Sequence, residues 1–399
     1  MVIYHIAHRL VGVGDDNVCR GCSMIRPHHL VNFCCKNTKI KLMSTSCVQR
    51  DCIFPMHILG GGSIGFLFAA AMQRARGDVT MLLRKHHKPR LRVTSCEKSS
   101  TATKYFAPVQ VCRPSDRQII STCDVRAEII SDVHDPIKCL LICTKANDAI
   151  PALSSIWDRL DRKNAAKVII LSNGALAIRD SIQRHFNDHQ DVQIITATTT
   201  HGAYTEQSSD TQSNISGYCL VHAGEGLTYC TNDKFIDACQ KVGWKGGTLS
   251  EFEMNMMLWK KLAANCVINP LTAIHGVKNG QLLSLDNTER TITYILEELS
   301  SIAILEMESF IQAEEDVEVQ AHLQRSIREE LSVDFLKNFV TKVMTDTADN
   351  ISSMLQDVNA KRTTEVRFLN GYVAHLGKEK YSIDCQYNKD MCNKVEDLK

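Results

Sequence analysis

The chain has 399 residues, of which 44% are hydrophobic and 23% charged, a composition typical of globular proteins that bury a core; the length suggests two domains. Its 46 Lys and Arg residues nearly balance its 45 Asp and Glu residues, which argues against charge-driven binding to nucleic acid or to an anionic membrane surface. No apolar stretch reaches the roughly 18 to 20 residues that cross a bilayer. We therefore expect a soluble protein with no nucleic-acid or membrane partner.

Residues 1–52 differ from the rest of the chain because they show no sustained hydrophobic period. We interpret them as a disordered or misassigned extension ahead of Met43 or Met56. One alternative is a mitochondrial transit segment, since the stretch is net basic, although Asp15 and Asp16 argue against it. The other is a zinc site, which lacks a second C-x2-C pair; its candidate ligands are Cys19, Cys22, His28, His29, Cys34 and Cys35.

The 17 cysteines are odd in number and scattered, which indicates a reducing compartment, so we predict a cytoplasmic protein. A mitochondrial location is the alternative if residues 1–52 are a transit segment. We predict no metal site.

Residues 53–247 alternate short apolar runs with helix-length amphipathic segments, a pattern that predicts βαβ units and a Rossmann-type, mostly parallel sheet. The expected strands lie at 56–59, 79–83, 138–143, 167–171 and 192–197. From residue 248 the sequence becomes rich in Leu, Glu, Lys and Ile with a single proline, so we predict an all-helical domain over 248–385, followed by a tail over 386–399.

The first expected strand runs into a G-x-G-x-x-G motif, Gly60 to Gly65, followed by small and apolar residues that suit a helix. In this context Gly60 makes the tight turn, Gly62 lets the backbone approach a pyrophosphate, and Gly65 lets the helix pack closely on the strand. The pyrophosphate would then lie at a helix N-terminus. The predicted cofactor-binding residues here are Gly60, Gly61, Gly62, Ser63, Ile64 and Gly65.

The second expected strand ends at Arg84 and a basic segment, where NAD-binding proteins place an acidic residue. A guanidinium there suits a 2′-phosphate, so we predict NADPH as the cofactor. A solvated basic loop is the alternative. Lys145 and Asn173 follow two later strands, where ligands of parallel sheets bind, although each could equally belong to a turn.

Lys261, Asn265 and Asn269 are spaced four residues apart in an otherwise apolar segment, so a helix places them on one face. Buried Asn side chains need hydrogen-bond partners, and a polar ligand is one solution; bonds to neighbouring helices are the other. Ser353 and Glu365 add a hydroxyl and a carboxylate farther along, but their spacing alone indicates no function.

Taken together, these segments resemble the 2-dehydropantoate 2-reductase (ketopantoate reductase) family. The matching pieces occur in the family's order: ILGGGSIG at 58–65, Arg84, TKA at 144–146, Asn173 and Gly174, TTHGA at 199–203, LWKKLAANCVINPLTA at 258–273, Asn279 and Gly280, SSMLQD at 352–357, and Thr364 with Glu365. The extension over residues 1–55 has no counterpart in the family.

The resemblance implies reduction of 2-dehydropantoate to (R)-pantoate with NADPH, in a cleft between the two domains, as a step of pantothenate (vitamin B5) and coenzyme A biosynthesis. The implied catalytic residues are Lys261, which would donate the proton, and Glu365, which would contact the cofactor side of the cleft. The implied substrate-binding residues are Asn173, Asn265, Asn269, Asn279 and Ser353, while Asn173 and Ala203 would lie where cofactor and substrate meet. We expect a small-molecule substrate as the partner and a homodimer as the candidate assembly.

The residues themselves agree with such chemistry, because hydride transfer to a ketone leaves charge on oxygen that a positioned ammonium can stabilise and protonate. Two alternatives remain open: a reductase of another 2-oxo acid or an imine, and a non-catalytic NADPH-binding regulator. Retention of Lys261 with its two Asn neighbours argues against the regulator.

Overall fold

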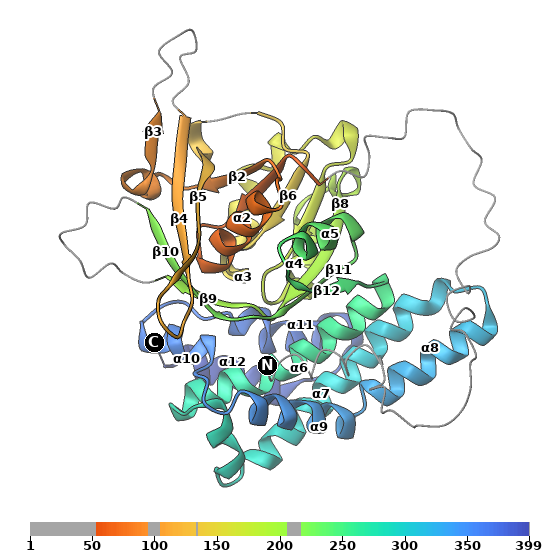
Figure 1. Cartoon of the computed structure of the whole chain (residues 1–399). Helices are drawn as coiled ribbons and strands as arrows, with labels where there is room; N and C mark the ends of the chain where they lie inside the picture. Colours follow the sequence, from red (N-terminus) through yellow and green to blue (C-terminus); the bar gives the residue numbers. More distant parts are fainter. Residues whose placement is uncertain (1–52, 95–103, 133–134, 206–216, 399) are drawn as a thin grey trace, which may run out of the picture.

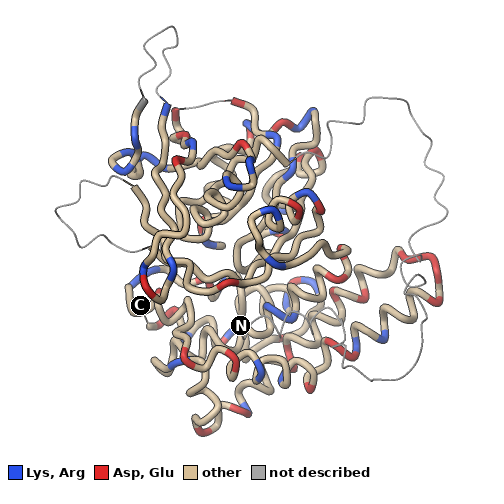
Figure 2. The backbone as a smooth tube through the Cα atoms, in the orientation of Figure 1, with Lys and Arg blue, Asp and Glu red and all other residues tan. Residues whose placement is uncertain are grey.

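The computed structural model describes residues 53–94, 104–132, 135–205 and 217–398, which form a sheet domain and a helical domain packed on one another (Figure 1). The expectations for residues 1–52, including the zinc site and the transit segment, lie outside these ranges. Acidic and basic residues are interspersed over both domains (Figure 2). Within the described ranges, no helix combines the length and apolar character needed to cross a bilayer.

The centre of the sheet consists of six parallel strands, which confirms the predicted Rossmann-type core. Their order is β8 (Gln193–Thr199), β7 (Lys167–Ile170), β6 (Cys139–Ile142), β1 (Met56–Leu59), β2 (Val79–Leu83) and β5 (Ile119–Ile129). Strands β1, β2, β6 and β7 are buried along their whole length, as expected for parallel strands with helices on both faces. All five predicted strands are present within two residues of their expected ends.

Six further strands extend the sheet at both edges and make it mixed. On one side β11 (Leu227–Cys230) pairs antiparallel with β8 and carries β12 (Lys245–Thr248). On the other side β4 (Lys104–Cys112) pairs antiparallel with β5 and is joined by β10 (Tyr218–Gly224), β9 (Gly202–Thr205) and β3 (Arg92–Thr94). The predicted strands did not include these six.

Two hydrophobic cores lie on opposite faces of the sheet. One contains α2 (Ser63–Arg74) and α5 (Asp233–Lys241), together with alternate residues of the central strands such as Ile58. The other contains α3 (Ala146–Ser154), α4 (Ala175–His185) and the intervening strand residues such as Leu59. This second core continues without a break into the helices of the C-terminal domain.

The C-terminal domain is all helical, as predicted. Its helices are α6 (Glu251–His275), α7 (Thr288–Phe310), α8 (Val317–Glu330), α9 (Val333–Asp346), α10 (Ser353–Asn359), α11 (Asn370–Tyr381) and α12 (Gln386–Glu396). Helix α6 begins at a capping box of Ser250 and Glu253 and ends at Gly276, whose φ of 66° suits a glycine. It packs against α7, α9, α10 and α12 and so forms the centre of the domain.

Most of the predicted tail over residues 386–399 forms α12 and packs onto this domain. Asn388 is fully buried there, and its amide donates hydrogen bonds to the carbonyl of Ile295 and to Glu298. Met391 and Val395 are also buried, since apolar side chains four apart share one face of the helix. In the structure, residues 386–396 therefore belong to the helical domain.

Candidate functional site

A cleft with a volume of about 570 Å³ lies between the two domains, at the carboxyl ends of β1 and β6. The chain leaves β1 toward β2 on one side and later enters β6 on the other, so this is the point where the strand order reverses and where open parallel sheets bind ligands. The cleft collects most of the predicted site: Gly60, Gly61, Gly62, Ser63, Ile64, Arg84, Lys145, Asn173, Ala203, Lys261, Ser353 and Glu365 line it.

The glycine loop has the geometry that the motif predicts. Gly60 has a φ of 128°, and a Cβ there would lie 2.7 Å from the backbone carbon of Cys143. A Cβ on Gly65 would lie 2.0 Å from the carbonyl oxygen of Gly60, so only glycine lets α2 pack this closely. At Gly62, by contrast, a Cβ would meet nothing within 4 Å, which leaves the N-terminus of α2 open to a ligand.

The basic segment after β2 also lines the cleft. Arg84 is 57% exposed and its Nη2 lies 3.4 Å from Asp148 Oδ1, so its guanidinium is available to an anion. His87, which the sequence did not single out, covers Gly61: a Cβ on that glycine would lie 2.8 Å from the imidazole ring. Burial and the nearby His86, Arg90 and Arg84 lower the pKa of His87 to about 4, so its imidazole is neutral at pH 7.

Lys261 enters the cleft from α6. Its Nζ donates hydrogen bonds to Thr198 Oγ1 at 3.0 Å and to the carbonyl of Thr199 at 3.2 Å, both at the end of β8. Burial lowers the pKa of the ammonium from 10.5 to about 8, against the opposing effect of the Glu365 carboxylate. Lys261 is therefore mostly protonated at pH 7 but gives up its proton more easily than an exposed lysine.

Glu365 joins the two domains at the floor of the cleft. Its Oε1 accepts a 2.8 Å hydrogen bond from the N–H of Ala146 at the start of α3, and Asn173 is a second partner. Burial raises the pKa of this carboxyl, while both hydrogen bonds oppose that shift. Asn173 thus lies beside Glu365.

Asp357, in α10, is a second link between the domains. Its Oδ1 accepts hydrogen bonds from Lys145 Nζ at 2.7 Å and from Arg362 Nε at 2.9 Å. The carboxylate is almost completely buried, so these two cations compensate its charge.

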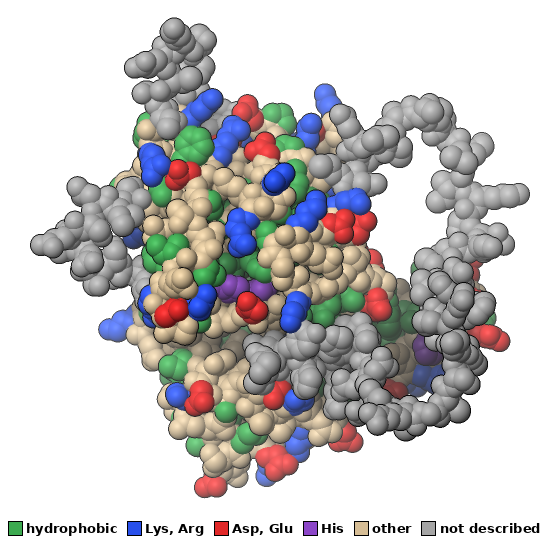
Figure 3. All heavy atoms as spheres, viewed as in Figure 1, with side chains coloured by type: hydrophobic (Ala, Val, Ile, Leu, Met, Phe, Trp, Pro, Cys, Tyr) green, Lys and Arg blue, Asp and Glu red, His purple; other side chains and the backbone are tan. Residues whose placement is uncertain are grey.

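In the space-filling view, histidine side chains are visible near the boundary of the two domains, beneath several Lys and Arg side chains (Figure 3).

A smaller cavity adjoins the cleft at Lys261 and Asn173 and extends toward α11. Asn265 lines it, together with Thr198, Leu258, Leu262 and Tyr372. Lys261 and Asn265 therefore share one cavity, one helical turn apart on α6, as their spacing predicts.

Two predicted substrate ligands lie elsewhere in the second domain. Asn269 is one turn farther along α6 and is buried, while Asn279 is buried in the short helix Asn279–Ser284, where its Nδ2 donates to Thr347 Oγ1 at 2.9 Å. Neither is among the described residues that line the two cavities. Their role in substrate binding stays a prediction.

Several residues of the cleft had no predicted role. Asp357 lay within a quoted motif, and Arg362 follows it by five positions, but the contact of Asp357 with Lys145 joins residues 212 positions apart. No local pattern reveals such a pair. Also without an earlier role are His86, His87, His201 and Gln356.

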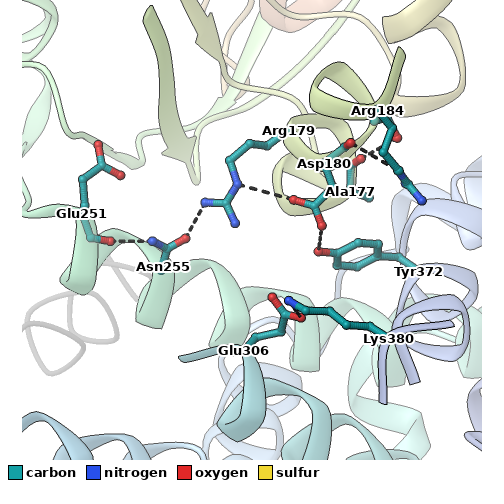
Figure 4. A network of polar contacts seen from close by, with 10 residues as sticks. Ala177, Arg179, Asp180, Arg184, Glu251, Asn255, Glu306, Tyr372 and Lys380 are labelled. Atoms are coloured by element: carbon teal, nitrogen blue, oxygen red, sulfur yellow. Dashed lines mark hydrogen bonds and ion pairs between the residues drawn. The ribbon is translucent and has the colours of Figure 1, made fainter. Parts of the chain in front are cut away.

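Behind the smaller cavity, a polar network connects α4 with the helical domain (Figure 4). The hydroxyl of Tyr372 donates a 2.6 Å hydrogen bond to Asp180 Oδ2, and Arg179 Nη1 donates a 2.7 Å bond to Asn255 Oδ1. Burial and the charge of Asp180 raise the pKa of Tyr372, which therefore stays protonated and remains a donor. The network connects the two domains next to the smaller cavity, which Tyr372 also lines.

Comparison with known proteins identifies related sequences over both domains. The family described as "Ketopantoate reductase PanE/ApbA" matches residues 56–229, and its C-terminal part matches residues 253–399. A Vibrio cholerae protein named 2-dehydropantoate 2-reductase is 32% identical over 263 residues, which cover 65% of this chain and 77% of the relative. An Archaeoglobus fulgidus protein of the same name is 25% identical over 354 residues, covering 85% and 96%.

Solved structures share the fold over both domains. The structure of 2-dehydropantoate 2-reductase from Methylococcus capsulatus matches with a TM-score of 0.61 at 14% identity, over 86% of this chain and 96% of that one. D-mandelate dehydrogenase, in a ternary structure with NADH and anilino(oxo)acetate, matches with a TM-score of 0.59 at 18% identity, over 86% and 97%. At such identities the likeness shows a common fold.

Proposed function

Because this chain belongs to the ketopantoate reductase family, we propose that it is an oxidoreductase that converts 2-dehydropantoate to (R)-pantoate, with NADPH as hydride donor and Lys261 as proton donor. The observation that carries the proposal is a shared cleft: the glycine loop and Lys261 line the same cavity although they come from different domains. This reaction belongs to pantothenate and coenzyme A biosynthesis.

The residues of the cleft fit a dinucleotide. The open N-terminus of α2 suits a pyrophosphate, and the close approach at Gly60 and Gly65 leaves no space for other side chains. A reduced nicotinamide bound here would supply a hydride to the ketone carbon. The solved D-mandelate dehydrogenase carries NADH, and for this chain Arg84 favours the 2′-phosphate of NADPH.

Lys261 would protonate the ketone oxygen. Charge develops on that oxygen as the carbonyl is reduced, and an ammonium next to it stabilises the charge and donates a proton. Thr198 and the carbonyl of Thr199 hold Nζ in place through hydrogen bonds, and Glu365 sustains the charged form. The lowered pKa of Lys261 makes the ammonium a stronger acid near neutral pH.

The polar side chains around Lys261 would hold the substrate. Asn173, Asn265 and Ser353 line the cavities next to it and offer neutral amides and a hydroxyl, which bind carboxylate and hydroxyl groups without removing the proton from the ammonium. Asn269 and Asn279 complete the proposed substrate-binding set. Asn173 and Ala203 would lie where the cofactor meets the substrate, and Glu365 would contact the cofactor side of the cleft.

A direct assay tests the proposal. Purified protein should oxidise NADPH when 2-dehydropantoate is added, and more slowly with 2-oxo acids that lack its hydroxymethyl group. Lys261→Ala should lower turnover at least about 10²-fold, the lower end for general acid catalysis, with little change in the Kd of NADPH. Turnover of another 2-oxo acid with a higher kcat/KM would show a different substrate, and turnover preserved at saturating substrate in the variant would show that another group is the acid.

The assembly and the compartment remain predictions. One structural relative, from Staphylococcus aureus, is described as a dimeric ketopantoate reductase, and we propose a homodimer here as well. We propose a cytoplasmic location, with the mitochondrion as the alternative if residues 1–52 direct import. Size-exclusion chromatography with light scattering and imaging of a tagged full-length chain test the two statements.

A further inference from the structure

Arg362 places a positive charge of the helical domain in the proposed cofactor cleft. It lines the same cavity as Gly60, Gly62 and Ser63 at the start of α2. Its side chain is 55% exposed, so the guanidinium faces solvent in the cleft and is not buried in the domain. The proposed catalytic chemistry does not use it.

The backbone at the end of α10 determines the position of Arg362. Helix α10 ends in a Schellman motif: Lys361 has a φ of 51°, its N–H donates to the carbonyl of Val358 at 2.9 Å, and the N–H of Arg362 donates to the carbonyl of Asp357 at 2.8 Å. This turn reverses the chain at the end of the helix. The side chain of Arg362 is thereby brought back beside Asp357.

Asp357 also holds the side chain of Arg362. Arg362 Nε donates a 2.9 Å hydrogen bond to Asp357 Oδ1, the oxygen that also accepts from Lys145 Nζ. In the part of the chain that the structure describes, no protein partner is found for the two Nη groups. Asp357 carries one negative charge between two cations, and the nearby Glu365 carboxylate interacts with Lys261 as well as with Lys145. The guanidinium of Arg362 keeps a fork of donors for a further anion.

The glycine loop, which lines the same cleft, offers dipoles without charge. Helix α2 starts at Gly62 with no side-chain cap and no acidic residue in its first turn, so its free N–H groups attract an anion. The loop from Gly60 to Ile64 contains no cationic side chain. A doubly charged group bound there needs compensating charge from elsewhere, and Arg362 and Lys145 supply it.

We propose that Arg362 binds the pyrophosphate of the dinucleotide from the helical domain, opposite the glycine loop, with Asp357 as the residue that positions it. The inference rests on the proposed function, because it takes the cleft as a dinucleotide site. Cofactor binding then uses both domains. The contact would connect the cofactor to the segment from Ser353 to Glu365, which also carries two of the proposed site residues.

Equilibrium binding of NADPH and NADH to Arg362→Gln tests the proposal, read from the fluorescence of the chain's tryptophans. Loss of a charge-assisted contact should raise both Kd values by the same factor, at least about tenfold, and should weaken their dependence on ionic strength. Arg362→Lys, which keeps the charge, should recover part of the loss. Arg367→Gln is the matched control: Arg367 is also exposed, pairs with Glu396 within the helical domain and does not line the cleft, so both Kd values should equal those of the wild type.

Three results would overturn the proposal. Unchanged Kd values in Arg362→Gln would exclude the contact, and a loss for NADPH alone would assign the guanidinium to the 2′-phosphate. A lowered thermal midpoint with unchanged ionic-strength dependence would show a structural role. If the wild type binds neither nucleotide, the proposed function fails first, and the two failures are thereby distinguished.

Discussion

Raising the pH should inactivate the protein in step with deprotonation of Lys261. A general acid must carry its proton when the substrate arrives, and kcat/KM reports the ionisation of the free protein. With a pKa of about 8, about nine tenths of the molecules are protonated at pH 7 and about one tenth at pH 9. We therefore expect kcat/KM at pH 9 to be about a tenth of its value at pH 7.

An ordinary lysine would behave differently. A side chain with the unshifted pKa of 10.5 would stay almost fully protonated at pH 9, and kcat/KM would hardly change. Because the Glu365 carboxylate raises the pKa of Lys261, Glu365→Gln should move the alkaline limb of the profile to lower pH. Steady-state kinetics over a pH series with constant ionic strength measures both profiles. A limb that begins above pH 10 would refute the reasoning.

The same shift should appear in the stability of the protein. The pKa of Lys261 is lower in the folded state than in the unfolded state, so folding releases a proton, and the cost of burying the ammonium is fully present below about pH 8. A difference of 10.5 minus 8 corresponds to about 3 kcal/mol, which disappears as the pH rises through the unfolded value. The free energy of unfolding of the wild type should therefore gain about 2 kcal/mol on that of Lys261→Met between pH 7 and pH 9.5, measured by urea denaturation. A constant difference would show that burial does not perturb this lysine.

Four other changes have separable outcomes. Gly65→Ala should lower the thermal midpoint sharply, because its Cβ would lie 2.0 Å from the carbonyl oxygen of Gly60, whereas Gly62→Ala should leave the midpoint unchanged and weaken only cofactor binding, measured by fluorescence titration. Arg84→Ala should raise the KM of NADPH at least about tenfold, the equivalent of a lost charge-assisted hydrogen bond, with the KM of NADH nearly constant; equal effects in steady-state assays would contradict NADP preference. A chain shortened to begin at Met43 should fold and match the full chain in kcat, and zinc released from the full-length protein would contradict our interpretation of its first 52 residues.

The central strands were predictable because their surroundings are uniform. Strands buried on both faces select continuous apolar runs, and such runs stand out between amphipathic helices. The strands β4 and β5 were not predicted, because many of their residues are partly exposed and Pro108 lies inside β4. The turn-forming residues at 113–118, between two stretches that contain β-branched or aromatic side chains at about half of their positions, were the available signal.

The candidate site, like the sheet, was predictable only in part. Helical spacing places Lys261 and Asn265 correctly, since both lie on one helix whose geometry is fixed. The cover of His87 over Gly61 and the pairing of Lys145 with Asp357 depend on how distant segments pack, which spacing along the chain does not encode. Such contacts follow from the tertiary structure alone.

The unbroken core that runs from α3 and α4 into the helical domain bears on how this protein can be divided. Helix α6 is buried over most of its 25 residues, and part of that surface is covered by the sheet domain. A fragment starting near residue 248 would expose this apolar surface to water, and surfaces of that kind cause aggregation. The sheet domain therefore cannot be exchanged with that of another reductase by a cut near residue 248. A working chimera has to carry α3, α4 and α6 together, so that their facing surfaces stay matched.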